Sequence, residues 1–398
     1  MRRVYFDNNA TTPLLPEVFA AMRPWLESNV GNASSIHHHG QEARAAVEAA
    51  RESVAKLFGC RPAEIVFTSG GTEGDNLALF GVLRPGDHLI TTTVEHHAVL
   101  NAAEHWRDSG SHGGDVTFVP VDGCGLVDPE DIWRALRPNT RLISVMLANN
   151  ETGVIQPLAE IGKVAAEAGV EFHTDAVQGA GKVSLDVRGL GVSLLSISGH
   201  KMHAPQGVGA LFVRKGTKLQ PLFHGGRHER SRRAGTENVP GIVALGKAAE
   251  LVREGFAKGD DARVAAMRDR LEQGILARVE AAGVNGGGAS CTIANSVPRV
   301  PNTTNLYFDH IEGEPLIIAL DLKGLACSTG AACSSGAIEP SHVLTAMGLG
   351  GERARGSVRL SLGKQNTVEE VDFALDLIPQ TVARLREISP TWRKVTVK

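Results

Sequence analysis

Short runs of apolar and β-branched residues alternate with stretches of helical period through the first two-thirds of this 398-residue chain. The runs predict strands at residues 64–68, 88–92, 116–120, 141–148, 171–174, 194–198 and 208–213. The stretches between them predict helices, among them 73–83, 129–136 and 157–168. Strands that alternate with helices in this way form a mostly parallel sheet covered by helices, so we expect an α/β fold.

The last third of the chain predicts a second, smaller α+β unit. Long helices are expected at 240–254 and 261–281, followed by strands at 303–308 and 357–362 and helices at 314–322 and 368–388. The length is sufficient for about two or three domains. We expect a large domain at residues 15–256 and a small domain formed by residues 1–14 and 257–398.

The charge and the composition of the chain limit the partners and the cellular location that we expect. The formal net charge is −3, with 42% hydrophobic and 21% charged residues, which gives no electrostatic reason to expect nucleic acid or an anionic membrane as partner. We find no apolar run long enough to span a bilayer and no signal peptide at the N-terminus. Five scattered cysteines without zinc-ligand spacing indicate free thiols in a reducing compartment, so a cytoplasmic location is expected.

Two charged side chains follow strands of the predicted sheet. Asp175 ends one apolar run, and Lys201 follows another in the sequence Ser198-Gly199-His200-Lys201. A lysine held out of bulk water can lose its proton and form a Schiff base, and an aspartate beside it can hold a protonated pyridine nitrogen. Pyridoxal phosphate needs both groups. The ordinary alternatives are a solvated lysine and a helix-capping aspartate.

The segment from Thr68 to Asn76 combines a strand end, a glycine turn and a helix start. Glycines allow backbone N–H groups to approach an anion, and a helix N-terminus favours negative charge, so a phosphate site fits. A capped helix without a ligand is the alternative. His96 could stack on a planar ring and move protons, or it could be an ordinary histidine. The histidines at 37–39 have no carboxylate or cysteine beside them and are expected to be solvated rather than to bind metal.

Two further residues admit two interpretations each. Cys333 lies among small residues, Ala331-Ala332 before it and Ser334-Ser335-Gly336 after it. This setting suits a reactive thiolate on a loop, whereas a buried structural thiol is the common alternative. Arg359 alternates into an apolar strand, where it must be paired. Its partner could be the carboxylate of a substrate or a structural acid.

Taken together, these segments resemble cysteine desulfurases of the nitrogen-fixation and iron–sulfur-assembly type, within the class V aminotransferase family. The resemblance covers nearly the whole chain. It rests on YFDNNATT at 5–12, GNASS at 31–35, TSGGTEGDN at 68–76, ANNETG at 148–153, HTDAVQ at 173–178, SISGHK at 196–201, RAGTEN at 233–238, the loop at Cys333 and EPSHVL at 339–344.

The resemblance implies fold type I of the pyridoxal phosphate enzymes and a role for each matching residue. Lys201 would bind the cofactor covalently, Asp175 would pair with its ring nitrogen, and His96 would stack on the ring. The remaining roles are contacts with the ring oxygen (Gln178 and Asn150), with the phosphate (Gly71, Thr72, Ser198 and His200), with the phosphate of the neighbouring subunit (Thr236), and with the substrate carboxylate (Arg359 and Asn32, with Asn150 near the substrate). A homodimer is therefore expected.

By the same resemblance, the chain converts L-cysteine to L-alanine and retains the sulfur as a persulfide on Cys333. An iron–sulfur scaffold protein or another sulfur acceptor would be its partner, and Cys333 could be a transient iron–sulfur ligand, with no firm metal site. Two alternatives remain at this point. The first is an aminotransferase or small-molecule lyase of the same fold, with Cys333 idle. The second is a catalytically silent scaffold or sulfur carrier.

Overall fold

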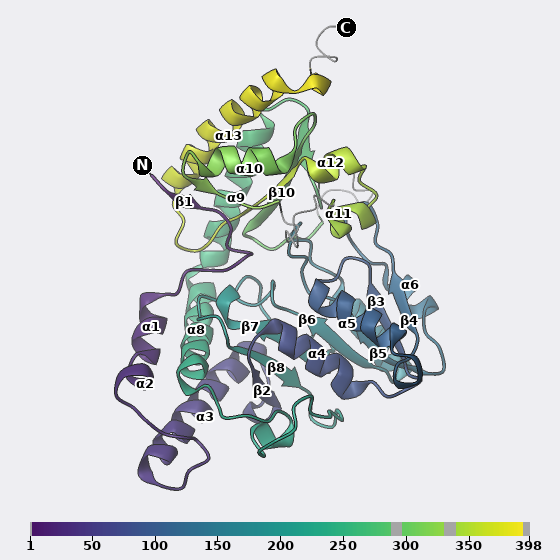
Figure 1. Ribbon diagram of the computed structural model, residues 1–398, viewed down its shortest axis with the longest axis vertical. Helices are drawn as coiled ribbons and strands as arrows, with labels where there is room; N and C mark the ends of the chain where they lie inside the picture. The colour runs from purple at the N-terminus through teal and green to yellow at the C-terminus, as the bar shows by residue number, and fades with distance from the viewer. Residues whose placement is uncertain (1, 288–296, 330–339, 393–398) are drawn as a thin grey trace.

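A computed structural model describes residues 2–287, 297–329 and 340–392 (Figure 1). A seven-stranded sheet forms the lower part of the view, with the strand order β2-β8-β7-β6-β5-β3-β4. Its strands are β2 (Ile65–Thr68), β3 (His88–Thr92), β4 (Val116–Val119), β5 (Thr140–Ser144), β6 (Glu171–Asp175), β7 (Leu194–Ser198) and β8 (Gly209–Val213). Only β8 runs against its neighbours, β2 and β7. The predicted α/β class with a mostly parallel sheet is confirmed.

Helices cover both faces of this sheet because its strands are apolar on both faces. One face packs against α4 (Gly71–Val82) and α5 (His97–Asp108). The other face packs in a larger cluster with helices that include α3 and α8. The helices on that side are α1 (Pro16–Met22), α3 (His38–Phe58), α6 (Pro129–Arg134), α7 (Leu158–Ala168) and α8 (Val239–Lys258), with α2 (Pro24–Glu27) after α1. Neighbouring strand residues such as Leu194 and Leu195 belong to opposite clusters, as the pleat requires.

The upper part of the molecule has its own hydrophobic core. Its three-stranded antiparallel sheet has the order β12-β10-β9, and a short parallel pair joins β1 to β11. Its elements are β1 (Val4–Tyr5), α9 (Asp260–Leu276), β9 (Ala282–Val284), β10 (Thr303–Phe308), α10 (Gly313–Asp321), β11 (Leu325–Ala326), α11 (His342–Ala346), α12 (Gly351–Arg355), β12 (Ser357–Ser361) and α13 (Val368–Ile388). The proposed domain boundaries at 14/15 and 256/257 stay a prediction.

Two predicted elements are longer than the observed ones. Strand β5 ends at Ser144 rather than at residue 148, because Ala148 instead forms a separate bridge with Ile155. Helix α9 ends at Leu276 rather than at residue 281, and Ala281 has a φ of 45° directly before β9 begins. A positive φ at a residue with a side chain interrupts the helix and reverses the chain direction.

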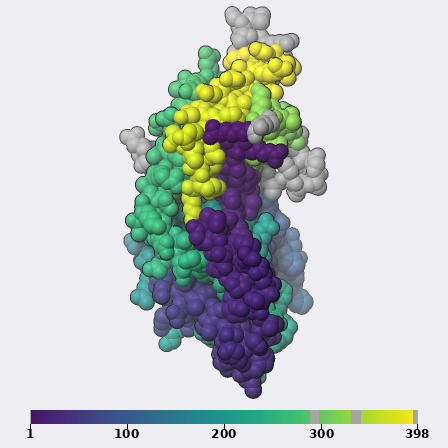
Figure 2. Space-filling view, turned by 90° about the vertical axis from the view of Figure 1, so that its left-hand side faces the viewer, coloured from purple at the N-terminus to yellow at the C-terminus, as the bar shows by residue number. Residues whose placement is uncertain are grey.

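The N-terminal segment connects the two parts. Figure 2 shows it against the C-terminal helix α13, from where it continues toward the far end of the molecule. Val4 and Tyr5 pair with β11 of the upper part, whereas Thr12 bonds to the carbonyl of His200, just after β7. Residues 7–11 therefore lie at the junction of the two parts. Within the described ranges, no helix is both long and apolar enough to cross a membrane.

A buried ion pair anchors the segment that follows β8. Arg51 on α3 donates from both terminal nitrogens to Glu229, at 2.7 Å each, and both side chains are about 5% exposed or less. Glu229 also accepts from the backbone nitrogen of Phe67 at 2.9 Å. Since Arg51 further donates to the carbonyl of Ile65, the pair fixes α3, β2 and the segment carrying Thr236 relative to one another.

We expect Arg51→Met to lower the free energy of unfolding by about 3–5 kcal/mol, because it leaves the Glu229 carboxylate buried without its cation. The shift of the urea midpoint at constant slope measures this loss. Arg44→Met is the matched control on an exposed position of the same helix, with an expected change of about 0.5 kcal/mol or less. Equal effects of the two substitutions would contradict the assigned role of the pair.

Candidate active site

A pocket opens at the carboxyl ends of β6 and β7, where the two parts of the molecule meet. Its cavity volume is about 370 Å³, which lies in the range of small-molecule binding sites. Ten of the side chains predicted from the sequence line it: Gly71, Thr72, His96, Asn150, Asp175, Gln178, Ser198, His200, Lys201 and Arg359. Parallel strands place their carboxyl ends on one rim, which is why residues far apart in the chain converge here.

Asp175 is the last residue of β6, and its side chain is 5% exposed. One carboxylate oxygen accepts a hydrogen bond from the backbone nitrogen of Val177 at 2.9 Å. Burial raises the pKa of Asp175, while the neighbouring His96, the Val177 amide and Lys201 lower it. A carboxylate held in this way can pair with a protonated ring nitrogen in the pocket.

Lys201 ends the short 3-10 turn Gly199–Lys201 that follows β7. Its Nζ donates to the carbonyl oxygens of Asn9 at 2.5 Å and Ala10 at 2.6 Å. Burial and then the guanidinium of Arg359 lower the pKa of Lys201 to about 8. Far more of the amine is therefore neutral near physiological pH than in an ordinary lysine, and a neutral amine can attack an aldehyde.

The N-terminus of α4 forms the anion-binding end of the pocket. A side chain at Gly71 would place its Cβ 2.7 Å from Val177, so only glycine fits there. Ser198 and His200 line the same pocket, and His200 Nδ1 lies 3.1 Å from the Thr11 hydroxyl. Burial and then Lys201 lower the pKa of His200 to about 4, which leaves a neutral imidazole. Open backbone N–H groups, a helix N-terminus and a serine hydroxyl fit a phosphate.

His96 is the N-cap of α5, where its Nδ1 accepts from the backbone nitrogen of Ala98 at 3.1 Å. Burial lowers the pKa of this imidazole. The preceding residue, Glu95, is fully buried and bonds to the Thr92 hydroxyl and the Met146 amide. Burial raises the pKa of Glu95 to about 8, so that this side chain is mostly neutral at pH 7. The loop that presents His96 is thus held by an uncharged acid.

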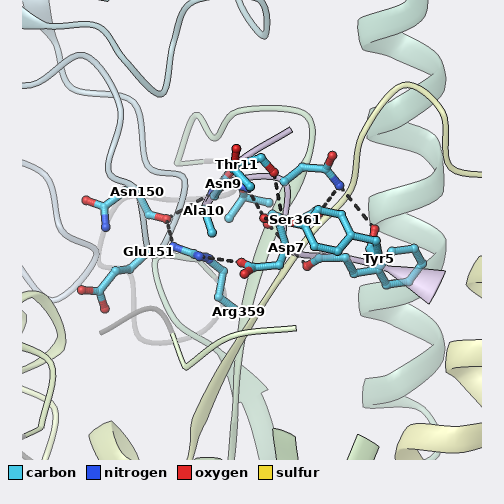
Figure 3. A network of polar contacts seen from close by, with 12 residues as sticks. Tyr5, Asp7, Asn9, Ala10, Thr11, Asn150, Glu151, Arg359 and Ser361 are labelled. Atoms are coloured by element: carbon cyan, nitrogen blue, oxygen red, sulfur yellow. Dashed lines mark hydrogen bonds and ion pairs between the residues drawn. The ribbon is translucent and has the colours of Figure 1, made fainter. Parts of the chain in front are cut away.

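Arg359 approaches the pocket from β12 of the upper part and is 4% exposed (Figure 3). One terminal nitrogen lies 2.8 Å from Asp7, and the other donates to the carbonyl of Asn150 at 2.9 Å. Its Nε has no hydrogen-bond partner among the described residues, although it is buried. The structural acid considered from the sequence is therefore present, and the guanidinium still faces the pocket.

Three predicted residues are not among the described side chains that line the pocket. Asn32 is exposed, and its side-chain oxygen accepts from the backbone nitrogen of Ser34 instead. Thr236 is also exposed. Cys333 lies outside the described residues, so its predicted role is not tested by the geometry. The pocket reaches Ser328, five residues before it.

The described cysteines differ in state. Cys60 and Cys327 carry free thiols, whereas Cys124 is disulfide-bonded, so the expectation of free thiols is wrong for Cys124. The composition gave no signal that distinguishes one of five scattered cysteines from the others. Burial raises the pKa of Cys327 to about 12, and Asp7 adds to the increase. A thiol with that pKa is a poor nucleophile at neutral pH.

Two polar side chains of the site had no assigned role in the sequence. Asn9 lines the pocket and bonds to residues of both parts of the molecule. Asp75 on α4 is 1% exposed, and its Oδ1, 3.5 Å from His173 Nε2, has no hydrogen-bond partner within the described residues. The signal for Asp75 was a charged residue two positions before the apolar run Leu77-Ala78-Leu79 of a helix. Burial of such a residue requires a reason.

These residues fit pyridoxal phosphate. The pocket is lined by an acid, Asp175, by a lysine of lowered pKa, Lys201, and by Gly71 at the N-terminus of a helix. Among the described residues, no group of three or more histidine, cysteine, aspartate or glutamate side chains is placed to hold a metal ion. The histidines at 37–39 are exposed at the start of α3, as expected for solvated side chains. The expectation that no carboxylate lies beside them is wrong, because His38 and His39 lie 3.2 Å and 3.6 Å from Glu42, one helical turn along α3.

Known proteins resemble the chain over its full length. The profile of the aminotransferase class-V family matches residues 4–373. Cysteine desulfurases of Dictyoglomus turgidum and Methanosarcina thermophila are each 47% identical over 393 residues, which are 98% of this chain and 97% and 94% of those proteins. A solved NifS-like protein has a TM-score of 0.87 at 37% identity, covering 96% of this chain and 100% of its own. A structure of SspA in complex with cysteine has a TM-score of 0.78 at 35% identity, covering 91% and 99%.

The lowered pKa of Lys201 is testable in the cofactor-free protein. Because only the neutral amine reacts with acetic anhydride, we expect half-maximal labelling of Lys201 near pH 8, mapped by peptide mass spectrometry. The same peptide from denatured protein is the control, with a midpoint near the ordinary lysine pKa of about 10.4. Arg359→Met should move the midpoint of the folded protein to higher pH, since a cation is removed. Coincident midpoints in folded and denatured protein would contradict this assignment.

Proposed function

The chain belongs to the class-V aminotransferase family and, within it, to the cysteine desulfurases, and we propose that it cleaves L-cysteine with the pocket residues described above. The observation that carries this proposal is the convergence of Lys201 and Asp175 on one pocket that the N-terminus of α4 also lines. The products are L-alanine and one sulfur atom, retained as a persulfide on Cys333.

Pyridoxal 5′-phosphate is the proposed cofactor. When bound, it supplies an electron sink that stabilises negative charge on the Cα of the substrate. Lys201 would hold it covalently, Asp175 would face its ring nitrogen, and His96 would stack on its ring. Its phosphate would contact Gly71, Thr72, Ser198 and His200, and its ring oxygen would contact Gln178 and Asn150.

The side chains of this chain have separate tasks in the reaction. Arg359, with Asn150 and Asn32, binds the substrate carboxylate and so orients the amino acid. Lys201 Nζ, once free, removes the proton from Cα, for which its lowered pKa is suited. The Cys333 thiolate then attacks the substrate sulfur. The S–S bond forms as the C–S bond breaks, and the electron pair of the broken bond stays with Cβ. Cβ then takes up one proton, and Lys201 returns the proton that it removed to Cα, which gives alanine and leaves the persulfide on Cys333.

Cys333 rather than Cys327 is the proposed sulfur acceptor. Cys327 directly follows β11, and its thiol has a pKa raised to about 12 by burial. In the sequence, Cys333 lies among small residues, a setting that suits a reactive thiol. An iron–sulfur scaffold protein, or another sulfur acceptor, is the proposed recipient, and a cytoplasmic location and a transient iron–sulfur contact at Cys333 stay predictions.

The decisive experiment incubates the protein with L-cysteine in the absence of any 2-oxo acid. We expect one alanine for each sulfur transferred, and peptide mass spectrometry should find the added sulfur on Cys333. Cys333→Ser should still bind cysteine but lose sulfur transfer, because a hydroxyl is a far poorer nucleophile than a thiolate. Cys327→Ser is the matched control and should retain most activity.

Two results would contradict the proposal. Added sulfur on Cys327 with none on Cys333 would overturn the assignment of the acceptor. Alanine formation that requires a 2-oxo acid would instead indicate an aminotransferase.

The second proposal concerns assembly. We propose a homodimer in which Thr236 of one subunit completes the phosphate site of the other. The exposure of Thr236, in a segment fixed by the Arg51–Glu229 pair, supports this arrangement. Lys201→Ala and Thr236→Arg should each inactivate the protein when present alone.

Mixing the two inactive variants tests the shared site directly. After subunit exchange, a mixed dimer has one site with both defects and one intact site, so roughly a quarter of wild-type activity should return. Ultracentrifugation of each variant controls for the dimer itself. No recovery of activity in confirmed mixed dimers would place Thr236 in its own subunit's site or outside both.

A further inference from the structure

Lys182 is a buried lysine close to the pocket that the reaction described above does not use. It is 9% exposed, and within the described part of the chain it has no carboxylate partner. Its Nζ donates to the side-chain oxygens of Asn9, at 2.7 Å, and Gln178. Burial lowers its pKa well below the ordinary value, and Lys201 and Arg359 lower it further. A polar head group is costly at such a position, so an apolar side chain would serve better if packing were its only task.

The contact with Lys182 bears on the orientation of the Gln178 amide, that is, on which positions its oxygen and its nitrogen occupy. The Oε1 of Gln178 accepts from Lys182, and its Nε2 donates to the carbonyl of Asn9 at 3.0 Å. A reversed amide would place its oxygen against the carbonyl oxygen of Asn9 and would remove the oxygen that now accepts from Lys182. Lys182 and the Asn9 carbonyl together therefore favour the observed orientation. The Gln178 nitrogen carries two hydrogens, of which the Asn9 carbonyl accepts one, and because Gln178 lines the pocket, the second can serve an acceptor there.

Asn9 does not depend on Lys182 in the same way. Its side chain also accepts from Asn302 at 3.1 Å and donates to Thr303 at 2.9 Å and to the carbonyl of Asn150 at 3.1 Å. Loss of Lys182 would leave these three hydrogen bonds in place. The effect of Lys182 on the site is thus expected to pass through Gln178.

We propose that Lys182 is a positioning residue that holds the Gln178 amide with its donor nitrogen toward the cofactor. This inference rests on the proposed function, because the ring oxygen of the cofactor is the acceptor that Gln178 would serve. A negatively charged ring oxygen requires a donor, and a reversed amide would present an oxygen to it. Lys182 acts on the cofactor without touching it.

The test is a double-mutant cycle with Lys182→Met and Gln178→Met. Its readouts are the dissociation constant of pyridoxal phosphate from the cofactor-free protein, the visible absorbance of the bound cofactor, and kcat and KM for cysteine. We expect Lys182→Met to weaken cofactor binding roughly tenfold and to shift the absorbance, as the loss of about one hydrogen bond to a charged acceptor would. In the Gln178→Met background, the same substitution should change neither quantity further.

Lys364→Met is the matched control. Lys364 lines the same cleft as Lys182. Unlike Lys182, it makes no hydrogen bond to Gln178 among the described residues; its backbone carbonyl accepts from Arg263 instead. The substitution should leave cofactor affinity and absorbance unchanged. If Lys182→Met alone does not fold, the comparison of the double variant with Gln178→Met still decides, since replacing both polar partners by apolar groups is well tolerated.

Additive effects of Lys182→Met and Gln178→Met on cofactor affinity would overturn the proposal, as would a lower melting temperature with unchanged absorbance. Weaker cofactor binding by the double variant than by Gln178→Met would overturn it as well. The wild-type protein separates these outcomes from failure of the proposed function. Absence of cofactor binding or of alanine formation by wild-type protein contradicts the function, whereas normal wild-type behaviour with an additive cycle contradicts only the role of Lys182.

Discussion

The hydrogen bonds of Asn9 join the two parts of the molecule at the active site. Its carbonyl oxygen accepts from Lys201 and Gln178, which follow strands of the large sheet. Its side chain bonds to Thr303 on β10 of the upper part and to the carbonyl of Asn150 in the lower part. The pocket exists because residues 7–11 lie between two separate hydrophobic cores and satisfy polar groups from both. A shift of this segment would displace Lys201 and Arg359 together, since Arg359 bonds to Asp7.

The sheet and much of the pocket were predictable because several site residues lie at or just after the end of an apolar run that forms a strand. Asp175, Ser198 and Lys201 show this pattern directly. Parallel strands have their carboxyl ends at the same edge of the sheet, so these residues come together there. The prediction did not include helix α3, although its buried residues Val47 and Val54 are one heptad apart. Helix α3 consists largely of alanine and charged residues, so its sequence shows only a weak hydrophobic periodicity. For that reason the helix was not predicted.

Contacts between distant segments could not be predicted from local patterns. The partnership of Lys182 with Asn9 joins residues 173 positions apart, and that of Arg359 with Asp7 joins residues 352 apart. The sequence required a partner for Arg359 but could not choose between a substrate and an acid, because both satisfy the same guanidinium. Asn32 and Thr236 were predicted from resemblance alone, and both are exposed outside the pocket. Exposure is compatible with the role of Thr236 toward a neighbouring subunit, whereas the role of Asn32 toward the substrate stays a prediction.

Burial also affects the pKa values of the acids in and next to the pocket. Asp75, Glu95 and Asp175 lie close together, and burial raises the pKa of each. Only Asp175 has His96, the Val177 amide and Lys201 to favour its anionic form. The negative charge of Asp175 in turn raises the pKa of both Asp75 and Glu95. The contacts of Asp175 with His96, the Val177 amide and Lys201 therefore oppose the effect of burial on its pKa, while the charge of Asp175 disfavours ionisation of Asp75 and Glu95.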